Sequence, residues 1–352
     1  MSARAREFAA RLGVAFPIVQ APMAGGPTTP ALVAAVGEAG ALGSIGAAML
    51  GPAAIAEACA ATRERTARPF LVNLFVLPPA SPSPGELVRA LPRLAPFHEE
   101  LGLPPPAIPN SWGEDLEAQV DAVLAARPAV VGTHFGPPPP RLLAGCRARG
   151  ILVVSTATTP DEARALEAAG VDAVVAQGAE AGGHRGTFLR PVEESLFGTM
   201  ALVPAVVDAV RIPVIAAGGI MDGRGVAAAL ALGASAAQIG TAFLACPEAG
   251  THPLHKAALG RAEGTVLTRG VTGRHARGLR NRLLVELDAS AADAPDYLVQ
   301  SVLSGPLRAA AARQGRPELM AMWAGQGHAM ARAEPAAEVV ARLVREAGLE
   351  AA

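Results

Sequence analysis

Short apolar runs, each bounded by glycine, proline or a polar residue, recur eight times along the chain. They cover Pro17–Ala21, Leu42–Ile45, Phe70–Phe75, Ala129–Thr133, Ile151–Ser155, Ala173–Gln177, Pro213–Ala217 and Ala236–Gly240. Runs of this length and composition are typical of strands buried on both faces, as in a parallel sheet. The pattern therefore predicts eight short strands.

Alanine-rich segments with helical periodicity separate these runs. The clearest are Thr29–Glu38, Pro160–Ala169 and Gly223–Leu232. Thr159 and Asp222 stand where helix N-caps belong, and Gly170 and Gly233 where helices end. Eightfold alternation of strand and helix predicts a TIM (β/α)8 barrel. An open doubly wound sheet is the structural alternative, although such sheets more often have fewer strands.

The remaining segments indicate additions to this barrel. We expect loops at the proline-rich stretches, two extra helices between the third and fourth strands, and an exterior amphipathic helix at Pro335–Ala347. Thr265–Glu286 is interpreted as a connector and Asp293–Gln314 as helical. The predicted division is a barrel of residues 1–262 and 312–352, with a small, mostly helical second domain, residues 263–311, capping its mouth.

Composition narrows the function classes. Of the 352 residues, 51% are apolar and 17% charged, which suits a compact, well-buried globular protein rather than a disordered one. Net charge is −1 and no basic run occurs, so we expect no nucleic-acid partner. No signal-peptide core and no run of 18 apolar residues is found, so we expect a soluble cytoplasmic protein without a membrane partner. The 3 cysteines are far apart, which indicates neither disulfides nor a metal site.

Polar residues and glycines gather where the predicted strands end, the face that carries active sites in this fold. The most informative stretch is Gln177–Gly186, a loop rich in glycine and alanine that contains one imidazole, His184. Such a backbone can approach a flat or anionic group closely. The loop therefore predicts a cofactor cradle with a catalytic base, although a lone histidine is more often structural.

Two glycine turns predict a phosphate site. Gly218-Gly219 and Gly240-Thr241 close the seventh and eighth strands, and a helix is expected to begin near Asp222. Free backbone N–H groups at such turns and at a helix N-terminus bind phosphate well. Each pair of glycines taken alone is more often a simple turn.

Several further side chains are candidates for the same cavity. Asn73 and Gln177 end strands and carry amides suited to the edge of a flavin or nucleotide ring, or to capping a neighbouring loop. Met23 lies in a Pro/Gly-rich loop that could cover a ring face. His134 could bind an anionic or nitro-type oxygen or make a structural hydrogen bond. Tyr297, the only tyrosine, could offer its hydroxyl from the cap.

These motifs resemble the nitronate monooxygenase family, formerly called 2-nitropropane dioxygenases. The blocks that carry the resemblance are Gln20–Pro27, His134–Gly136, Thr156–Thr159 with Gln177–Gly186, Gly218–Gly225 with Gln238–Thr241, Thr272–Gly278 and Trp323–Gln326. Together they span nearly the whole chain, and the block around His184 is quite specific. Gly132-Thr133 departs from the Ser-Phe that commonly precedes the family's His-Phe-Gly.

The resemblance implies a TIM-barrel enzyme with non-covalent FMN. Such an enzyme oxidises alkyl nitronates, propionate 3-nitronate among them, with O2 to a carbonyl compound and nitrite. His184 matches the family's catalytic histidine. Its implied FMN contacts are Asn73, Gln177, Gly182, Gly219 and Gln238 to Thr241, with Met23, Gly183 and Gly218 beside them. His134 and Tyr297 are assigned to the substrate, a nitronate or nitroalkane, in a monomer or homodimer without a metal.

Two other functions fit the same sequence. Quinone reductases and FMN-dependent enoyl-acyl carrier protein reductases share much of the Gly-Gly-His block, so an NAD(P)H-dependent FMN reductase is the main alternative. No Gly-x-Gly-x-x-Gly fingerprint follows a strand, which argues weakly against it. A flavin- or phosphate-binding module without turnover is the third hypothesis, and His184 in an open loop argues against it.

Overall fold

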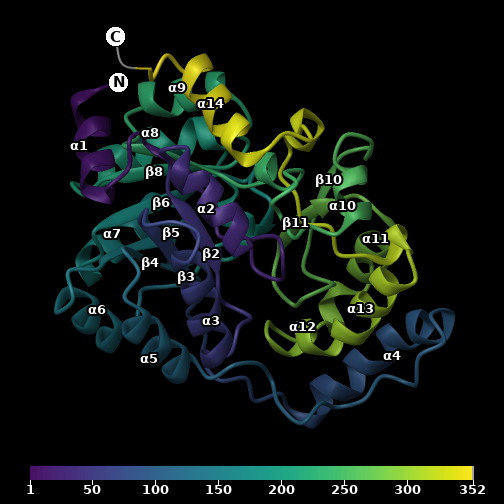
Figure 1. Cartoon of the computed structure of the whole chain (residues 1–352). Coiled ribbons are helices and arrows are strands. Elements are labelled where there is room, and N and C mark those ends of the chain that lie inside the picture. Colours follow the sequence, from purple (N-terminus) through teal and green to yellow (C-terminus); the bar gives the residue numbers. More distant parts are fainter. Residues whose placement is uncertain (351–352) are drawn as a thin grey trace.

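Eight parallel strands close into a barrel in the computed structural model, which describes residues 1–350 (Figure 1). They are β1 (Ile18–Gln20), β2 (Gly43–Gly46), β3 (Phe70–Phe75), β4 (Val130–His134), β5 (Leu152–Ala157), β6 (Ala173–Gln177), β8 (Val214–Ala217) and β9 (Ala236–Ile239). The order is β1-β9-β8-β6-β5-β4-β3-β2, and a parallel bridge between Val19 and Leu42 joins the two ends. The predicted TIM barrel is confirmed, and the open sheet is excluded.

Helices surround the barrel. They are α1 (Ala3–Leu12), α2 (Pro30–Glu38), α3 (Pro52–Arg63), α5 (Leu116–Ala126), α6 (Pro140–Arg147), α7 (Pro160–Ala169), α8 (Thr199–Ala209), α9 (Gly223–Ala231) and α14 (Ala336–Glu346). The hydroxyl of Thr159 caps α7 and the carboxylate of Asp222 caps α9, as predicted. Gly170 ends α7 with a left-handed φ of 93°, a conformation that costs glycine little. As predicted, α14 packs outside the barrel, against α2 and α9.

The barrel has an inner and an outer apolar layer. Inward-facing side chains such as Leu71, Val154 and Ile215 form one buried cluster, which also includes Phe8 and Leu12 of α1. A larger cluster lies between the strands and the surrounding helices. Because α1 shares the inner cluster, it closes one end of the barrel, and the opposite end remains available for a site.

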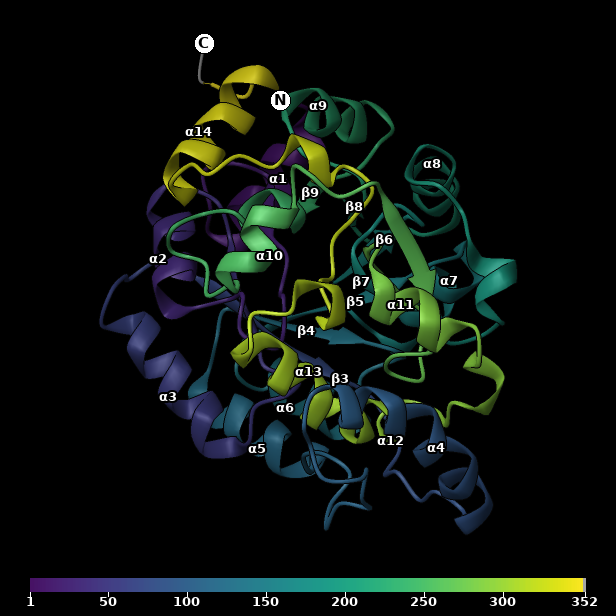
Figure 2. The ribbon, with the colours of Figure 1, turned by 90° about the vertical axis from the view of Figure 1, so that its right-hand side faces the viewer.

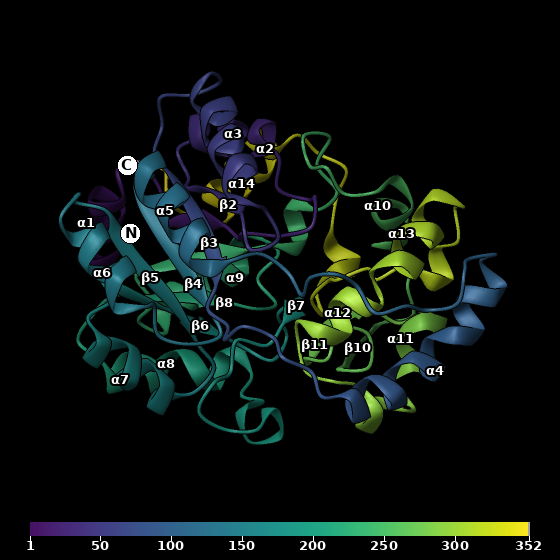
Figure 3. The same ribbon diagram turned by 90° about the horizontal axis from the view of Figure 1, so that it is seen from below.

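A second apolar core lies beside the barrel (Figures 1 and 3). We call the elements around it the cap: α4 (Pro84–Glu100), α10 (Pro253–Ala258), β10 (Thr265–Thr268), β11 (Ala276–Leu279), α11 (Arg282–Asp288), α12 (Val299–Leu303) and α13 (Gly305–Arg313). Both strands belong to an antiparallel sheet of order β10-β11-β7, whose third strand is β7 (Gly183–His184). The loop predicted to hold the catalytic base is thus a strand shared with the cap.

Three details differ from the sequence expectations. Thr265–Glu286 is not merely a connector, because it forms β10, β11 and α11. The helix expected over Asp293–Gln314 is broken at Ser304, next to Gly305 and Pro306, into α12 and α13. Of the two helices between β3 and β4, α5 packs on the barrel helix α3, and only α4 joins the cap core.

The second core also uses residues outside 263–311, among them Leu94 and Met322. The exact division of the chain into domains therefore stays a prediction. Short 3-10 turns complete the chain: η1 (Val192–Ser195), η2 (Thr241–Phe243), η3 (Ala291–Asp293), η4 (Pro317–Leu319) and η5 (His328–Met330). Within residues 1–350, no helix has the length and apolar character needed to cross a membrane.

Candidate active site

A cavity of about 750 Å³ opens at the carboxyl ends of the barrel strands, and residues of both the barrel and the cap line it. In Figure 2 the cap elements α10, α11 and α13 lie in front of the barrel strands. Every residue that the sequence proposed for a site lines it. These are Met23, Asn73, His134, Gln177, Gly182, Gly183, His184, Gly218, Gly219, Gln238, Gly240, Thr241 and Tyr297. The fold thus brings together residues from six strand ends, from the β7 loop and from the cap. Their individual roles stay predictions.

The two glycine turns present unused backbone donors to this cavity. Gly218 and Gly219 have φ angles of 114° and 71°, in the left-handed region that favours glycine. In the part of the chain that the structure describes, the amide N–H groups of Gly218, Gly219, Gly240 and Thr241 have no hydrogen-bond partner. Converging free amides of this kind are the usual means of holding a phosphate.

The N-terminus of α9, which we expected to contribute, is already occupied. The carboxylate of Asp222 accepts from the amides of Arg224 and Gly225, and that of Glu346 accepts from the amide of Gly223. Glu180 satisfies the first amide of α8 in the same way, at Thr199. The donors available for an anion are therefore those of the turns, not those of the helix.

Asn73 and Gln177 differ in how free they are. The Oδ1 atom of Asn73 accepts no hydrogen bond within residues 1–350, and its side chain packs on Gly132, where a Cβ would stand 2.6 Å from Oδ1. Gln177 instead donates to the carbonyl of His184 at 3.0 Å and accepts from the amide of Gly186 at 2.8 Å. Asn73 is thus open to a ligand, whereas Gln177 mainly shapes the β7 loop and keeps one N–H free.

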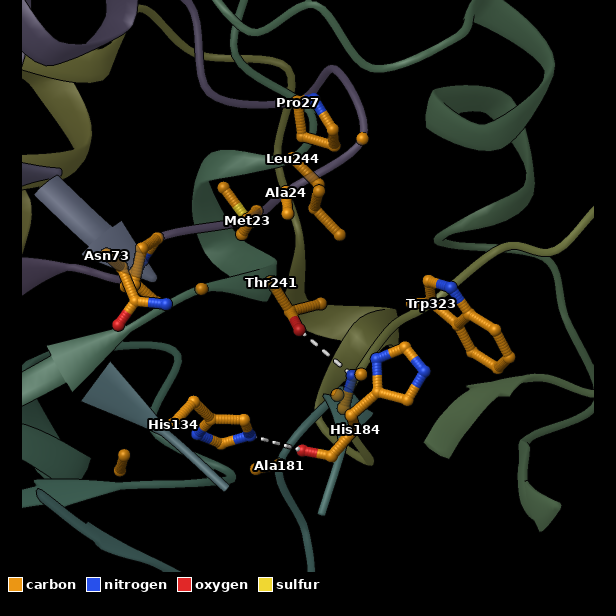
Figure 4. Close-up of a pocket in the computed structure, with 18 of the residues that line it drawn as sticks. Met23, Ala24, Pro27, Asn73, His134, Ala181, His184, Thr241, Leu244 and Trp323 are labelled. Atoms are coloured by element: carbon orange, nitrogen blue, oxygen red, sulfur yellow. Dashed lines mark hydrogen bonds between the residues drawn. The ribbon is translucent and has the colours of Figure 1, made fainter. Parts of the chain in front are cut away.

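His184 is held between the barrel and the cap (Figure 4). Its backbone pairs with Ala276 of β11, and its Nε2 lies 3.0 Å from the hydroxyl of Thr272. Its ring lies 5.0 Å from that of Tyr297 and 5.7 Å from that of Trp323. Burial, with smaller effects of nearby cations, lowers the pKa of His184 to about 3, so the imidazole is neutral near pH 7.

His134 has a largely structural contact. Its Nε2 lies 3.2 Å from the carbonyl oxygen of His184, so Nε2 must carry a proton and donate (Figure 4). Burial lowers the pKa of His134 to about 3. The neighbouring Phe135 has a φ of 79°, and the guanidinium of Arg274 lies 3.9 Å from its ring centroid. His134 thus supports the backbone of His184 as well as lining the cavity.

Buried charged groups hold the loop that follows His184. Arg185 is fully buried and donates to the carbonyls of Gln177, Gly178 and Ser195. The carboxylate of Glu162, also fully buried, accepts from the hydroxyl of Thr187 and from two backbone amides beyond it. Arg274 donates to the carbonyls of Arg185 and Thr187. These bonds fix where the imidazole points.

Sequence reasoning did not predict the arginine that lines the cavity. Arg308 of α13 lines it and is its only permanently charged side chain among the described residues. Its Nε donates to Ser304 and its Nη2 to the carbonyl of Ser301, whereas Nη1 has no partner within residues 1–350. No carboxylate of residues 1–350 lies within salt-bridge distance of Arg308, and burial lowers the pKa of its guanidinium. Only the fold shows that this arginine, one of many, faces the site.

Comparison with known proteins gives a consistent result. A family model described as nitronate monooxygenase matches residues 7–346. A nitronate monooxygenase of Pseudomonas aeruginosa is 46% identical over 349 residues, covering 96% of this chain and 98% of the relative.

Solved structures agree with this. The crystal structure of a nitroalkane oxidase from Streptomyces ansochromogenes is 44% identical with a TM-score of 0.90, covering 97% of this chain and 98% of that one. FabK from Thermotoga maritima is less similar, at 29% identity and a TM-score of 0.76, covering 99% of this chain and 97% of that one.

Proposed function

The chain belongs to the nitronate monooxygenase family, and we propose that it is an FMN-dependent enzyme that oxidises alkyl nitronates with O2 to a carbonyl compound and nitrite. The observation that carries the proposal is one cavity in which free backbone amides, a neutral buried imidazole and an unpartnered guanidinium meet. The first suits a phosphate, the second a proton transfer, and the third an anionic substrate.

The residues present fit FMN. Its phosphate requires several donors, and the unpaired amides of Gly218, Gly219, Gly240 and Thr241 meet that need, while the carboxylate of Glu180 beside the first turn is bound by Thr199. Its ring requires polar partners at the edge and apolar contact on a face. Asn73 and Gln238 offer the former, and Met23 offers the latter. When bound, FMN would supply the electron acceptor for the nitronate.

The chain's own residues would bind and orient the substrate and move a proton. A nitronate has already lost its α-proton, so its oxidation needs orientation rather than a base. A neutral nitroalkane must first lose that proton, and His184 is the candidate to take it. Burial is the main cause of its lowered pKa. A nitronate anion formed beside the ring would restore favourable charge and raise the pKa of His184.

Arg308 favours a substrate with a second anionic group. Because, among the described residues, Nη1 has no partner and no carboxylate pairs with the guanidinium, an anion in the cavity would gain a charge-assisted hydrogen bond. A carboxylate on the substrate is a suitable partner, because guanidinium N–H groups donate strong hydrogen bonds to carboxylate oxygens. We therefore propose nitronates that carry a carboxylate, such as propionate 3-nitronate, as preferred substrates.

Oxygen uptake by the flavin-loaded protein tests the proposal. Propionate 3-nitronate should give rapid uptake with release of nitrite, while NADH in a parallel sample should give negligible uptake. If NADH is oxidised rapidly and the nitronate is inert, the protein is instead a flavin reductase. If neither reacts in protein that holds its flavin, it is a binding module without turnover.

A further inference from the structure

The hydrogen bonds around His184 specify which of its two nitrogens carries the proton. Its Nε2 lies 3.0 Å from the hydroxyl oxygen of Thr272, and that hydroxyl lies 3.2 Å from the carbonyl oxygen of Arg274. Thr272 is almost fully buried. The three groups form a short chain from the imidazole to the backbone of the cap.

Counting protons decides the direction of this chain. A hydroxyl has one hydrogen to donate, and a carbonyl oxygen only accepts. The carbonyl of Arg274 receives no other hydrogen bond within residues 1–350, so the hydroxyl of Thr272 donates to it. The same hydroxyl must then accept from His184, which requires the proton on Nε2. The reverse direction would leave the carbonyl of Arg274 without a donor from residues 1–350, at the cost of one hydrogen bond.

The other ring nitrogen is directed at the cavity. Nδ1 of His184 makes no hydrogen bond to any residue in 1–350. It is not one of the fully buried polar atoms that lack a partner, so it is accessible from the cavity. In Figure 4 the imidazole lies between Trp323 and the space below Thr241. A ligand in the cavity can therefore reach Nδ1.

We propose that Thr272 is a positioning residue that holds His184 in its Nε2–H form, so that Nδ1 presents a lone pair to the substrate. This inference rests on the proposed function. When a nitroalkane binds, its α-carbon–hydrogen bond breaks, the proton moves to Nδ1, and the electron pair remains on the substrate as the nitronate. Imidazolium and nitronate form together, so charge is conserved and no further reactant is needed.

The same form has a consequence for nitronates. An oxygen of a nitronate carries negative charge and would be repelled by the lone pair on Nδ1. A supplied nitronate has no α-proton to lose, so its turnover depends less on Thr272 than turnover of a nitroalkane does. The charged or titratable groups near the ring are His134, Arg274, Tyr297 and Arg308, none of them a carboxylate. Among the described residues, Thr272 is thus the only one whose hydrogen bond selects the tautomer of His184.

Nitrogen NMR of the flavin-loaded enzyme with 15N-labelled histidine tests the proposal directly, because a lone-pair nitrogen resonates far from a protonated one. The signals of His184 are identified by their loss in His184→Asn. We expect Nδ1 to give the lone-pair signal in the wild type. A lone-pair signal from Nε2 instead overturns the proposal without any variant.

Variants of Thr272 then distinguish a role in positioning His184 from a role in protein stability. Thr272→Val should populate the other tautomer and lower kcat for a nitroalkane about 5- to 10-fold, the value of one hydrogen bond, with KM little changed. Thr272→Ser should restore both the spectrum and kcat. Thr62→Val, which removes a buried hydroxyl bond in α3 far from the cavity, is the matched control.

The substrates distinguish this proposal from the proposed function. Thr272→Val should lose less activity on a supplied nitronate than on the nitroalkane, because the nitronate has no α-proton to lose. Equal losses on nitronate and nitroalkane contradict the positioning role while leaving the function intact. An inert wild-type enzyme contradicts the function, yet the NMR result still reports on the tautomer.

Discussion

The barrel side of the cavity presents free backbone amides at two glycine turns, whereas the cap side presents an arginine, a tyrosine and a threonine. The barrel contributes the glycine turns at Gly218-Gly219 and Gly240-Thr241. The cap contributes Thr272, Tyr297 and Arg308. Only β7, with His184, belongs to both, since it follows a barrel strand and pairs with a cap strand.

The difference indicates that the barrel and the cap have different functions in the site. Backbone amides held by a closed sheet are rigid and carry no charge that depends on pH, which suits a cofactor phosphate that every catalytic cycle reuses. Side chains on short helices vary without disturbing the barrel, which suits substrate recognition. Barrel variants should therefore alter cofactor retention, and cap variants should alter substrate kinetics.

The shared strand should show the largest effect. Replacing His184 by Asn removes the proposed base, and we expect kcat for a neutral nitroalkane to fall by about 10²- to 10⁴-fold, the usual contribution of general base catalysis. Steady-state oxygen uptake on a nitroalkane and on its preformed nitronate measures this. A variant that keeps full turnover on both substrates contradicts the role of His184.

A barrel variant should lose cofactor. In Gly218→Ala the new Cβ would lie 2.9 Å from the hydroxyl of Thr199 and 3.1 Å from the carbonyl of Gly178, at a φ of +114°. Such strain is worth about 1–3 kcal/mol, so we expect roughly 10- to 100-fold weaker flavin binding. Flavin fluorescence titration measures it.

Gly150→Ala is the matched control for Gly218→Ala. Its φ is +67° and nothing lies near its Cβ, so it carries the backbone strain without touching the cavity. If both variants retain flavin equally well, the glycine turns are not the phosphate site.

A cap variant should change substrate preference instead. Arg308→Met removes the unpartnered guanidinium, and we expect KM for propionate 3-nitronate to rise about 10- to 100-fold, with KM for an uncharged alkyl nitronate nearly unchanged. Parallel steady-state kinetics on the two substrates measure the difference. Arg313→Met, on the exposed side of the same helix, is the control. Equal changes in KM for both substrates would show that Arg308 does not bind the substrate carboxylate.

The smallest effect concerns stability in acid. Burial lowers the pKa values of His134 and His184 to about 3 and that of His255 to about 4. The unfolded chain takes up these protons near pH 6.5, whereas the folded chain does not. The stabilisation is therefore complete above pH 6.5 and is lost as the pH falls toward the folded values. Each ring accounts for up to about 2 kcal/mol at pH 5.

Thermal unfolding of the wild type and of His255→Gln between pH 7 and pH 5 measures this effect. The variant should lose less stability over that interval, because one fewer buried ring is left to be protonated on unfolding. A wild-type unfolding temperature that stays constant down to pH 5 would contradict the lowered pKa values.

The sequence alone was enough for the features that depend on neighbouring residues. Apolar runs predicted all eight barrel strands, and Thr159, Asp222 and Gly170 marked helix ends that the structure confirms. Strand order in a barrel follows from the alternation itself, so the residues at the strand ends could be assigned to one cavity in advance. Periodicity and capping are local, and a linear sequence contains them in full.

Only the tertiary structure decided which distant groups complete the site. Thr272 contacts His184 across 88 positions, and Glu346 occupies the N-terminus of α9 across 123. β10 and β11 became strands through pairing with each other and with β7, although their own residues looked like a connector. Arg308 differs from other arginines only in the cavity it faces. Long-range packing and hydrogen bonding fix these features, and no local pattern in the sequence encodes them.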